Sequence, residues 1–455
     1  MTSATARKTK QGLSGVFPVP GDKSISHRSL IFAALAEGVT EIYGLLESDD
    51  VLHTADALQK MGILIEKEDT AQGRVWRVTG GKLTSPKEPL YLGNSGTSAR
   101  LLAGVIAGQG ITACLTGDAS LSKRPMARVT EPLSKMGATF RQEKEDAALP
   151  LWIEGTATPK AIRYKSPVAS AQVKSAILLA GLNAEGETCV HEPGSSRDHT
   201  ERMLEAFGIA VETGAAYGGG SEAALKGGTK LVSPGRIDVP ADPSSAAFPA
   251  VAALITKKSF VVLPAVSMNP TRAGLYKILK KMGADIELKN ETSLGGEPVA
   301  DLHIRSGEVL KGCTVPAVYV PTMIDEYPIL AVAASVAEGV TRMEGLAELR
   351  VKESNRLEKI ADGLKACGVR TEIDGDDLIV YGRGHLSVMG GATIETGFDH
   401  RIAMSFLVLG GITREPVTID RADAIATSFP SFIKEMNKRG CDIRLAGEQR
   451  AALGS

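Results

Sequence analysis

Residues 23–38 read KSISHRSLIFAALAEG, and this stretch carries the pattern that decides the fold. A polar, cationic start is followed by an alanine-rich run that is apolar on all sides, which predicts a buried helix. Five other stretches share this design, and their starts follow one another at intervals of 73 to 81 residues. Such regular spacing predicts a sixfold internal repeat. The six starts are marked by Ser24, Thr97, Ser170, Ser244, Asp325 and His400.

A second series of segments lies between these starts, and each one is an amphipathic stretch that ends in glycine before a strand-like alternation. The first reads LQKMGILIEKE over residues 58–68. Glycine in this place suits a left-handed C-cap that turns a helix into a strand. Each repeat is therefore predicted to be βαβαββ in an α/β fold, with one buried and one half-exposed helix. The glycines are Gly62, Gly137, Gly208, Gly283, Gly368 and Gly440.

The length of 455 residues exceeds what one hydrophobic core usually organises, so we expect two domains of three repeats each. The turn-rich RIDVPADPSS near residue 240 predicts the boundary. The proline-flanked VFPVPGD near residue 19 is consistent with a second crossing. One domain would then span 20–240, and the other would combine 1–19 with 241–455. The first dozen residues are expected to be frayed.

Charge is balanced at 52 basic and 53 acidic residues, and only 4% of residues are aromatic, which argues against nucleic-acid binding. Five cysteines without a CxxC pair argue against a disulfide framework or structural zinc, and the histidines show no metal-ligand spacing. No apolar run reaches membrane-spanning length, and the N-terminus lacks a signal-like apolar core. We expect a cytoplasmic monomer without metal or cofactor.

The helix starts are candidate anion sites, because a helix N-terminus exposes backbone NH groups and a partial positive charge. In PGDKSISHRS, Lys23, Ser24 and Arg28 place two cations and a hydroxyl within about one helical turn. An ordinary N-cap at Asp22 or Ser24, followed by solvated basic residues, explains this sequence equally well.

The second and third starts add neutral and cationic groups. LGNSGTSAR offers Asn94 as a cap and Gly96 where a backbone could approach a ligand closely, and Arg124 follows in an expected loop. Ser170 and Gln172 at the third start suit hydroxyls or a carboxylate. Plain capping, a flexible turn and a solvated basic loop are the alternatives.

The C-terminal half contains candidate acid–base groups. Lys352 and Arg356 are four residues apart, so we expect them on one helical face, where they repel unless an anion or Glu353 compensates. Asp325 begins an apolar run near these cations and could act as a general base, or could simply favour the helix dipole. Arg401 is expected in a first helical turn.

If the helix starts of both domains point at one interdomain cleft, the cations converge there. We expect that only strongly anionic ligands would neutralise them. The converging cations are Lys23, Arg28, Arg124, Lys352, Arg356 and Arg401.

From about residue 15 to residue 443 the sequence resembles the 5-enolpyruvylshikimate-3-phosphate synthase family. The matching segments are PGDKSISHR, LGNSGTSAR, GDASLSKRPM, SAQVKSAILLAG, IDEYPILA, VKESNRL and DHRIAMSF. The resemblance implies a two-domain inverse α/β barrel with three βαβαββ units per domain, closing around 3-phosphoshikimate and phosphoenolpyruvate. It also implies enolpyruvyl transfer to the 5-hydroxyl of 3-phosphoshikimate with release of phosphate, on the route to chorismate and the aromatic amino acids.

The resemblance assigns roles residue by residue. It places Lys23, Ser24, Arg28, Ser170, Gln172, Asp325 and Lys352 on 3-phosphoshikimate. It places Lys23, Gly96, Arg124, Gln172, Arg356 and Arg401 on phosphoenolpyruvate. Asp325 would take the hydroxyl proton, while Lys23 and Glu353 would exchange a proton with the enol methylene.

Three departures from the better-known branch of the family indicate its second branch. Thr427 stands where that branch has lysine, Ala171 replaces a serine, and Glu326 follows the expected base. Some second-branch members tolerate the inhibitor glyphosate and carry alanine at the place of Gly96. An added methyl group there would crowd a compact phosphoenolpyruvate mimic, so this chain is predicted to be sensitive.

Two alternatives remain at this point. The sister enzyme that acts on UDP-N-acetylglucosamine shares the architecture but usually has a reactive cysteine where this chain has Ala119. A non-catalytic anion-binding protein could use the same repeat, although Asp325 and Glu353 argue against it.

Overall fold

The computed structural model describes residues 2–71, 73–143, 148–216, 219–384 and 386–447. The chain divides into two compact units. The N-unit contains residues 21–240 and 294–297, and the C-unit contains residues 1–20, 241–293 and 298–455. These limits differ from the expected ones in two places, because Pro20 groups with the C-unit and Leu294–Glu297 groups with the N-unit.

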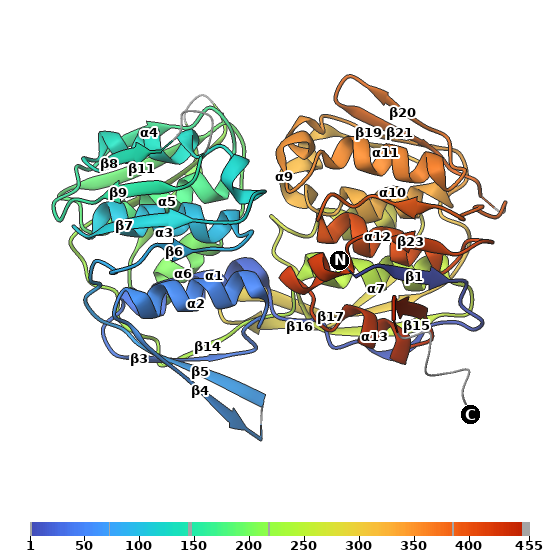
Figure 1. The fold of residues 1–455 in the computed structure, drawn as a ribbon, viewed down its shortest axis with the longest axis horizontal. Coiled ribbons are helices and arrows are strands. Elements are labelled where there is room, and N and C mark those ends of the chain that lie inside the picture. The colour runs from blue at the N-terminus through green and yellow to red at the C-terminus, as the bar shows by residue number, and fades with distance from the viewer. Residues whose placement is uncertain (1, 72, 144–147, 217–218, 385, 448–455) are drawn as a thin grey trace. The chain divides into compact units, whose positions relative to one another are not determined.

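Three four-stranded sheets belong to the N-unit, and Figure 1 labels several of their strands. The first has the order β14 (Arg236–Asp238), β3 (Val39–Tyr43), β5 (Gly73–Thr79), β4 (Leu64–Thr70). The second has the order β6 (Leu90–Tyr91), β7 (Thr112–Thr116), β9 (Leu151–Glu154), β8 (Thr139–Gln142). The third has the order β10 (Arg163–Lys165), β11 (Glu187–Glu192), β13 (Ser221–Lys226), β12 (Val211–Ala215).

Three further sheets belong to the C-unit. The first has the order β16 (Asp285–Leu294), β17 (Glu297–Arg305), β15 (Phe260–Ser267), β2 (Ser14–Val16). The second has the order β18 (Thr314–Val315), β19 (Val340–Met343), β21 (Asp377–Tyr381), β20 (Thr371–Asp374). The third has the order β22 (Thr393–Ile394), β23 (Val417–Ile419), β1 (Ala4–Arg7), β24 (Asp442–Leu445).

The sixfold repeat is visible in the strand pairing, because each sheet contains one parallel pair, such as β6 with β7, next to an antiparallel pair, such as β7 with β9. The two crossings near residues 20 and 240 exchange strands between repeats. β2 precedes the first repeat in sequence but pairs with β15, whereas β14 precedes the fourth repeat but pairs with β3. Because of these two exchanges, each sheet in both units has four strands.

The α/β repeats that the resemblance implies are confirmed, as in the order β6, α3, β7, α4, β8, β9. Among the described strands, the sheets are six separate four-stranded ones, and no hydrogen-bonded barrel closes. The reason is that each repeat completes its own sheet, so its outer strands, such as β4 and β8, pair on one side only.

Helices alternate with these strands as the sequence pattern predicts. Six are buried: α1 (Lys23–Leu35), α3 (Gly96–Gly108), α5 (Ala171–Gly181), α7 (Pro243–Ile255), α10 (Tyr327–Ser335) and α12 (His400–Gly410). Six have an exposed face: α2 (Asp49–Lys60), α4 (Ala127–Lys135), α6 (His199–Ala206), α8 (Gly274–Lys281), α11 (Arg356–Ala366) and α13 (Phe432–Lys438). Short helical turns are η1 (Leu121–Lys123), η2 (Ala317–Tyr319), α9 (Val320–Met323), η3 (Ala347–Val351) and η4 (Ala422–Thr427).

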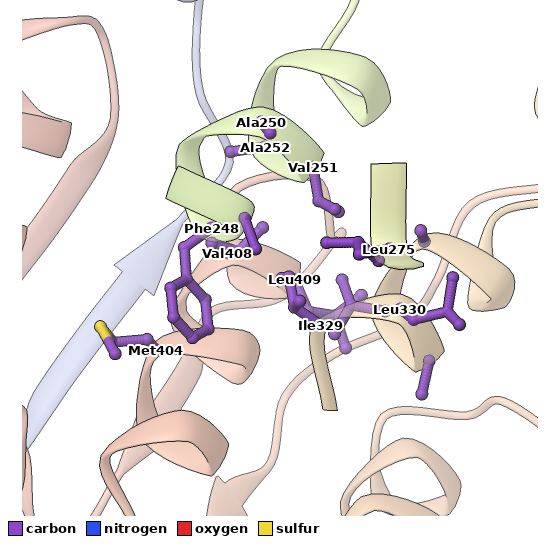
Figure 2. Close-up of a cluster of buried hydrophobic side chains, with 14 of the residues drawn as sticks. Phe248, Ala250, Val251, Ala252, Leu275, Ile329, Leu330, Met404, Val408 and Leu409 are labelled. Carbon is purple, nitrogen blue, oxygen red and sulfur yellow. The ribbon is translucent and has the colours of Figure 1, made fainter. Parts of the chain in front are cut away.

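Each unit has its own hydrophobic core around its buried helices. In the C-unit, α7, α10 and α12 pack against one another, and Figure 2 shows Phe248, Ile329 and Val408 in that cluster. In the N-unit, α3 and α5 approach closely. A Cβ on Gly104 would lie 2.3 Å from the carbonyl oxygen of Ala176, so only glycine fits there.

The N-terminal segment is ordered, contrary to the expectation that the first dozen residues fray. In β1, Ala4 is opposite Ile419 of β23 and Leu445 of β24. Ala4 and Ala6 are buried in the core of the C-unit. Their small size hid this contribution in the sequence.

Candidate active site

The start of α1 carries the first cation. Asp22 caps the helix, and its Oδ1 accepts a hydrogen bond from the backbone N of Ile25 at 2.8 Å. Lys23 Nζ then lies 2.8 Å from Oδ2 of Asp50, a mostly buried residue of α2. Asp22 is therefore the cap, and Lys23 has a carboxylate partner. The anion site at this helix start stays a prediction.

Arg28 lies one turn further along α1 and is buried. Its Nε donates to Thr200 Oγ1 at 2.7 Å, its Nη2 to Ser175 Oγ at 2.8 Å, and its Nη1 to the carbonyl oxygen of Ser24 at 3.0 Å. These bonds tie α1 to α5 and α6. The guanidinium is thus fixed in position by the oxygens of Thr200, Ser175 and Ser24.

His27 is buried between Lys23 and Arg28, and its Nδ1 lies 2.8 Å from Thr54 Oγ1. Burial holds the pKa of His27 well below its ordinary value, and the charges of Lys23 and Arg28 lower it further. The folded chain therefore keeps this imidazole neutral at a pH where the unfolded chain would protonate it.

This difference predicts a pH dependence of stability. The unfolded state binds more protons than the folded state below about pH 6.5. As the pH is lowered through this range, the free energy of unfolding of the N-unit should therefore fall by up to about 1.4 kcal/mol per pH unit because of His27. Urea unfolding followed by tryptophan fluorescence measures it, since both tryptophans, Trp76 and Trp152, belong to the N-unit. His27→Gln, which cannot titrate, should flatten the slope, and equal slopes would contradict the assignment.

The start of α3 differs from the expected cap. Ser95 is the N-cap, with its Oγ accepting from the backbone N of Ser98 at 3.1 Å. Asn94 instead accepts a hydrogen bond from Arg124 Nη2 and donates to Asp118 Oδ2 at 2.6 Å. Asn94 therefore holds Arg124 beside the helix start.

Gly96 opens α3 against two guanidinium groups. A Cβ added there would lie 2.7 Å from Arg100 Nη1 and 3.3 Å from Arg124 Nη1. Arg100 also donates to Gln172 Oε1 at 2.7 Å, while Gln172 Nε2 donates to Thr97 Oγ1 at 3.1 Å. Sequence reasoning missed Arg100, although its spacing of four residues from Gly96 places both on one side of the helix.

Ser170 is the N-cap residue of α5, without a hydrogen bond from its side chain to the helix. Its backbone N donates to Glu192 Oε1 at 2.7 Å. Glu192 also pairs at 2.9 Å with Lys174, which is buried along α5 and is 2.7 Å from Glu201. The buried ion pairs thereby anchor the loop that carries Ser170.

The C-unit places three carboxylates around Arg356, whose side chain is 0% exposed. Its Nε donates to Asp399 Oδ2 at 2.7 Å, its Nη1 to Asp325 Oδ1 at 3.0 Å, and its Nη2 to Glu353 Oε2. Burial alone would lower the pKa of Arg356, but the charges of Asp399, Glu353 and Asp325 outweigh it and raise the pKa. The guanidinium stays charged.

This cluster corrects the expectation that only an external anion could neutralise the cations. Arg356, like Lys23, has carboxylate partners within its own unit. Asp325 and Asp399 lie 31 and 43 residues from Arg356 in the sequence. Glu353 is its near neighbour, so only that partner was visible before folding.

Lys352 and Arg356 do not share a helical face, contrary to expectation. Lys352 ends η3 in an extended conformation, and α11 begins at Arg356 behind the cap Asn355. Asn355 starts α11, since its Oδ1 accepts from the backbone N of Glu358 at 3.4 Å, and η3 has already ended at Val351. Repulsion along one helix face is therefore not the relevant interaction.

Arg401 lies in the first turn of α12, as expected, and Asp399 caps this helix. Its Nη1 donates to the carbonyl oxygen of Asp325 at 3.2 Å and lies 3.7 Å from Glu326 Oε1. Its Nη2 is 3.9 Å from Asp325 Oδ2. The C-unit thus brings Asp325, Glu353, Arg356 and Arg401 together.

The expected site residues therefore fall into two groups. The N-unit holds Lys23, Ser24, Arg28, Gly96, Arg124, Ser170 and Gln172. The C-unit holds Asp325, Lys352, Glu353, Arg356 and Arg401.

One group of residues in the described part of the chain could hold a metal ion. Asp198, His199 and Glu297 offer ligand atoms within 4.8 Å of one another. His199 Nδ1 lies 2.6 Å from Glu297 Oε1, and Arg202 Nε donates to Asp198 Oδ2 at 2.8 Å. Asp198 thus has the Arg202 guanidinium beside it, and the contact between His199 and Glu297 links the turn 294–297 to α6.

In the described residues, no helix combines the length and apolarity needed to cross a bilayer.

The sequence is similar to known proteins over nearly its whole length. Residues 7–436 match the family model described as EPSP synthase (3-phosphoshikimate 1-carboxyvinyltransferase). The 3-phosphoshikimate 1-carboxyvinyltransferase of Rhodospirillum rubrum is 54% identical, covering 95% of this chain and 96% of that protein. That of Gluconobacter oxydans is 50% identical, with 96% and 98% covered.

Solved structures agree with this. An EPSP synthase from Acinetobacter baumannii is 47% identical, with a TM-score of 0.86 over 98% of this chain and 100% of that one. The enolpyruvyl transferase NikO from Streptomyces tendae is 17% identical, with a TM-score of 0.75 over 98% of both chains, and indicates the shared fold alone.

Proposed function

Because the chain belongs to the EPSP synthase family, we propose that it transfers the carboxyvinyl group of phosphoenolpyruvate to the 5-hydroxyl of 3-phosphoshikimate and releases phosphate. This is a step of the shikimate pathway towards the aromatic amino acids. The observation that carries the proposal is the cluster in which Asp325 and Glu353 flank Arg356, with Arg401 beside Asp325. Such a cluster supplies both proton acceptors and anion-binding guanidiniums.

We propose that the two units together hold the substrates. The 3-phosphoshikimate would be bound by Lys23, Ser24, Arg28, Ser170, Gln172, Asp325 and Lys352. The phosphoenolpyruvate would be bound by Lys23, Gly96, Arg124, Gln172, Arg356 and Arg401. Because these residues come from both units, substrate binding is expected to bring the units together. Small-angle scattering with and without 3-phosphoshikimate tests this, and identical curves would contradict it.

The proposed reaction is an addition followed by an elimination. Asp325 takes the proton of the attacking hydroxyl as the new C–O bond forms at C2 of phosphoenolpyruvate, and Lys23 or Glu353 protonates the methylene carbon. The bond to phosphate then breaks while the same carbon loses a proton. Arg124, Arg356 and Arg401 would stabilise the phosphate and carboxylate charge, a task that suits planar guanidinium groups.

A phosphate-release assay with phosphoenolpyruvate and two alternative acceptors tests the proposed function. We expect release with 3-phosphoshikimate and none with UDP-N-acetylglucosamine. Release with the second acceptor alone would identify the sister activity. Absence of release with both, in a protein that still binds phosphoenolpyruvate, would identify an anion-binding protein.

Gly96→Ala provides a further prediction at the proposed phosphoenolpyruvate side. The new methyl group meets the ends of two arginine side chains, which can move without unfolding the helix. We expect the KM for phosphoenolpyruvate to rise about tenfold, because displaced guanidiniums weaken charge-assisted hydrogen bonds, while the KM for 3-phosphoshikimate changes little.

Steady-state kinetics measures this effect, and glyphosate inhibition should weaken in parallel. Gly81→Ala is the matched control, since a Cβ there meets nothing within 4 Å. Equal inhibition of Gly96→Ala and the parent would remove the steric argument.

A further inference from the structure

Glu326 is a buried carboxylate beside the proposed catalytic base, and it is 2% exposed. It is the residue immediately before α10. A buried charge is retained only where other groups compensate it. Its Oε1 accepts a hydrogen bond from Ser244 Oγ and lies 3.7 Å from Arg401 Nη1. Glu326 therefore connects the start of α7 to the guanidinium of Arg401.

Ser244 is itself held in a defined orientation. Arg272 Nη2 donates to Ser244 Oγ at 2.8 Å, and the backbone N of Ser244 donates to Asp242 Oδ1 at 2.7 Å. Arg272 Nη2 also lies 3.2 Å from that Asp242 oxygen. A serine hydroxyl has one proton to donate. Because Ser244 Oγ accepts from Arg272, its proton is directed to Glu326.

The geometry of Arg401 shows what this chain of contacts can do. The Nη1 group lies between the carbonyl oxygen of Asp325, at 3.2 Å, and Glu326 Oε1. The Asp325 carboxylate is more distant, at 3.9 Å from Nη2, and is committed to Arg356 at 3.0 Å. Arg272 and Arg401 match Asp242 and Glu326 in number of charges, so the buried carboxylates have cations beside them.

From these contacts we propose that Glu326, oriented by Ser244 and Arg272, is a positioning residue that fixes the Arg401 guanidinium for phosphoenolpyruvate. The inference rests on the proposed function, in which Asp325 gains and loses a proton during turnover. An anchor beside Arg401 that takes no part in the proton transfer keeps that guanidinium in place when the charge on Asp325 changes. Bidentate recognition of a carboxylate depends on such fixed orientation.

Glu326→Gln keeps the size of the side chain and an acceptor for Ser244 but removes the charge facing Arg401. We expect the KM for phosphoenolpyruvate to rise about tenfold, with kcat and the KM for 3-phosphoshikimate within about twofold of the parent. Ser244→Ala should shift the same KM in the same direction. The double variant should fall short of the product of the two effects, because both changes act on one chain of contacts.

Glu372→Gln is the matched control, a partly exposed carboxylate of the C-unit that pairs with Arg370. Arg401→Lys separates this inference from the proposed function. If Arg401→Lys raises the KM for phosphoenolpyruvate and Glu326→Gln does not, the positioning role is wrong and the function stands. If kcat alone falls in Glu326→Gln, the role is also wrong.

A crystal structure of Glu326→Gln gives a readout that needs no turnover. We expect the Arg401 guanidinium to leave its place beside the Asp325 carbonyl or to occupy several orientations. An unmoved Arg401 would overturn the inference even if the parent showed no activity with the proposed substrates, and that lack of activity would separately overturn the proposed function.

Discussion

Replacing Asp325 by asparagine is expected to lower kcat by a factor of about 10² to 10⁴, the range that a general base usually contributes. The amide keeps the size of the side chain, and its oxygen can still accept from Arg356 Nη1, which is 3.0 Å from Oδ1. The carbonyl bond to Arg401 is unchanged, because it involves the backbone. The loss should therefore appear in kcat, while both KM values stay within a few-fold.

The control is Asp376→Asn, which changes an exposed aspartate of the same unit that pairs with Arg350. Single-turnover kinetics separates the chemical step from product release. If Asp325→Asn retained the parent kcat, Asp325 could not be the base. Glu353, which also contacts Arg356, would then be the next carboxylate to test by the same substitution.

The repeated elements were predictable because the signal for each lies within a short stretch of sequence. The all-apolar run after Ser24 predicted a buried helix, and α1 is buried from Ile25 to Ala34. Gly62 was predicted to end a helix in the left-handed conformation, and it has φ of +95°. Hydrophobic periodicity and glycine placement are local properties of the sequence, so the helices that they predict do not depend on knowing the tertiary contacts.

Long-range strand pairing was harder to predict. β1 completes a sheet with strands more than 400 residues away, Ala4 lying opposite Ile419 and Leu445. The four residues of β1, two of them alanines, have too short a pattern to predict a strand, and they do not indicate which strands β1 pairs with. The wrong expectation of a frayed N-terminus has this cause.

The site was predictable as a set of residues but less so as a set of contacts. Motif matching placed Arg356 and Arg401 among the ligand-binding groups, and the structure puts both beside Asp325. Motif matching could not show that Asp399, which caps α12, also binds Arg356, because Asp399 and Arg356 lie 43 residues apart. The predicted site did not include Arg100, because this residue lies one turn beyond the helix start.

Removing the Arg356 guanidinium is expected to destabilise the C-unit more than any other single substitution considered above. The side chain is completely buried and bonds to Asp399, Asp325 and Glu353. Arg356→Ala leaves these carboxylates facing a cavity without their cation, and breaking a buried ion pair in this way costs about 3 to 5 kcal/mol. Arg356→Lys keeps the charge, but one ammonium group cannot reproduce the planar set of contacts.

Stability and binding should both report this change. Because both tryptophans lie in the N-unit, tryptophan fluorescence follows that unit alone, whereas far-UV circular dichroism follows both. The Arg356 variants should lower the circular dichroism midpoint and weaken phosphoenolpyruvate binding, with Arg356→Lys less affected in stability than Arg356→Ala. Arg350→Lys is the control, since Arg350 pairs with Asp376 at a more exposed place. An Arg356→Ala variant as stable as the parent would mean that the three carboxylates do not depend on this guanidinium, and its role would then be confined to the substrate.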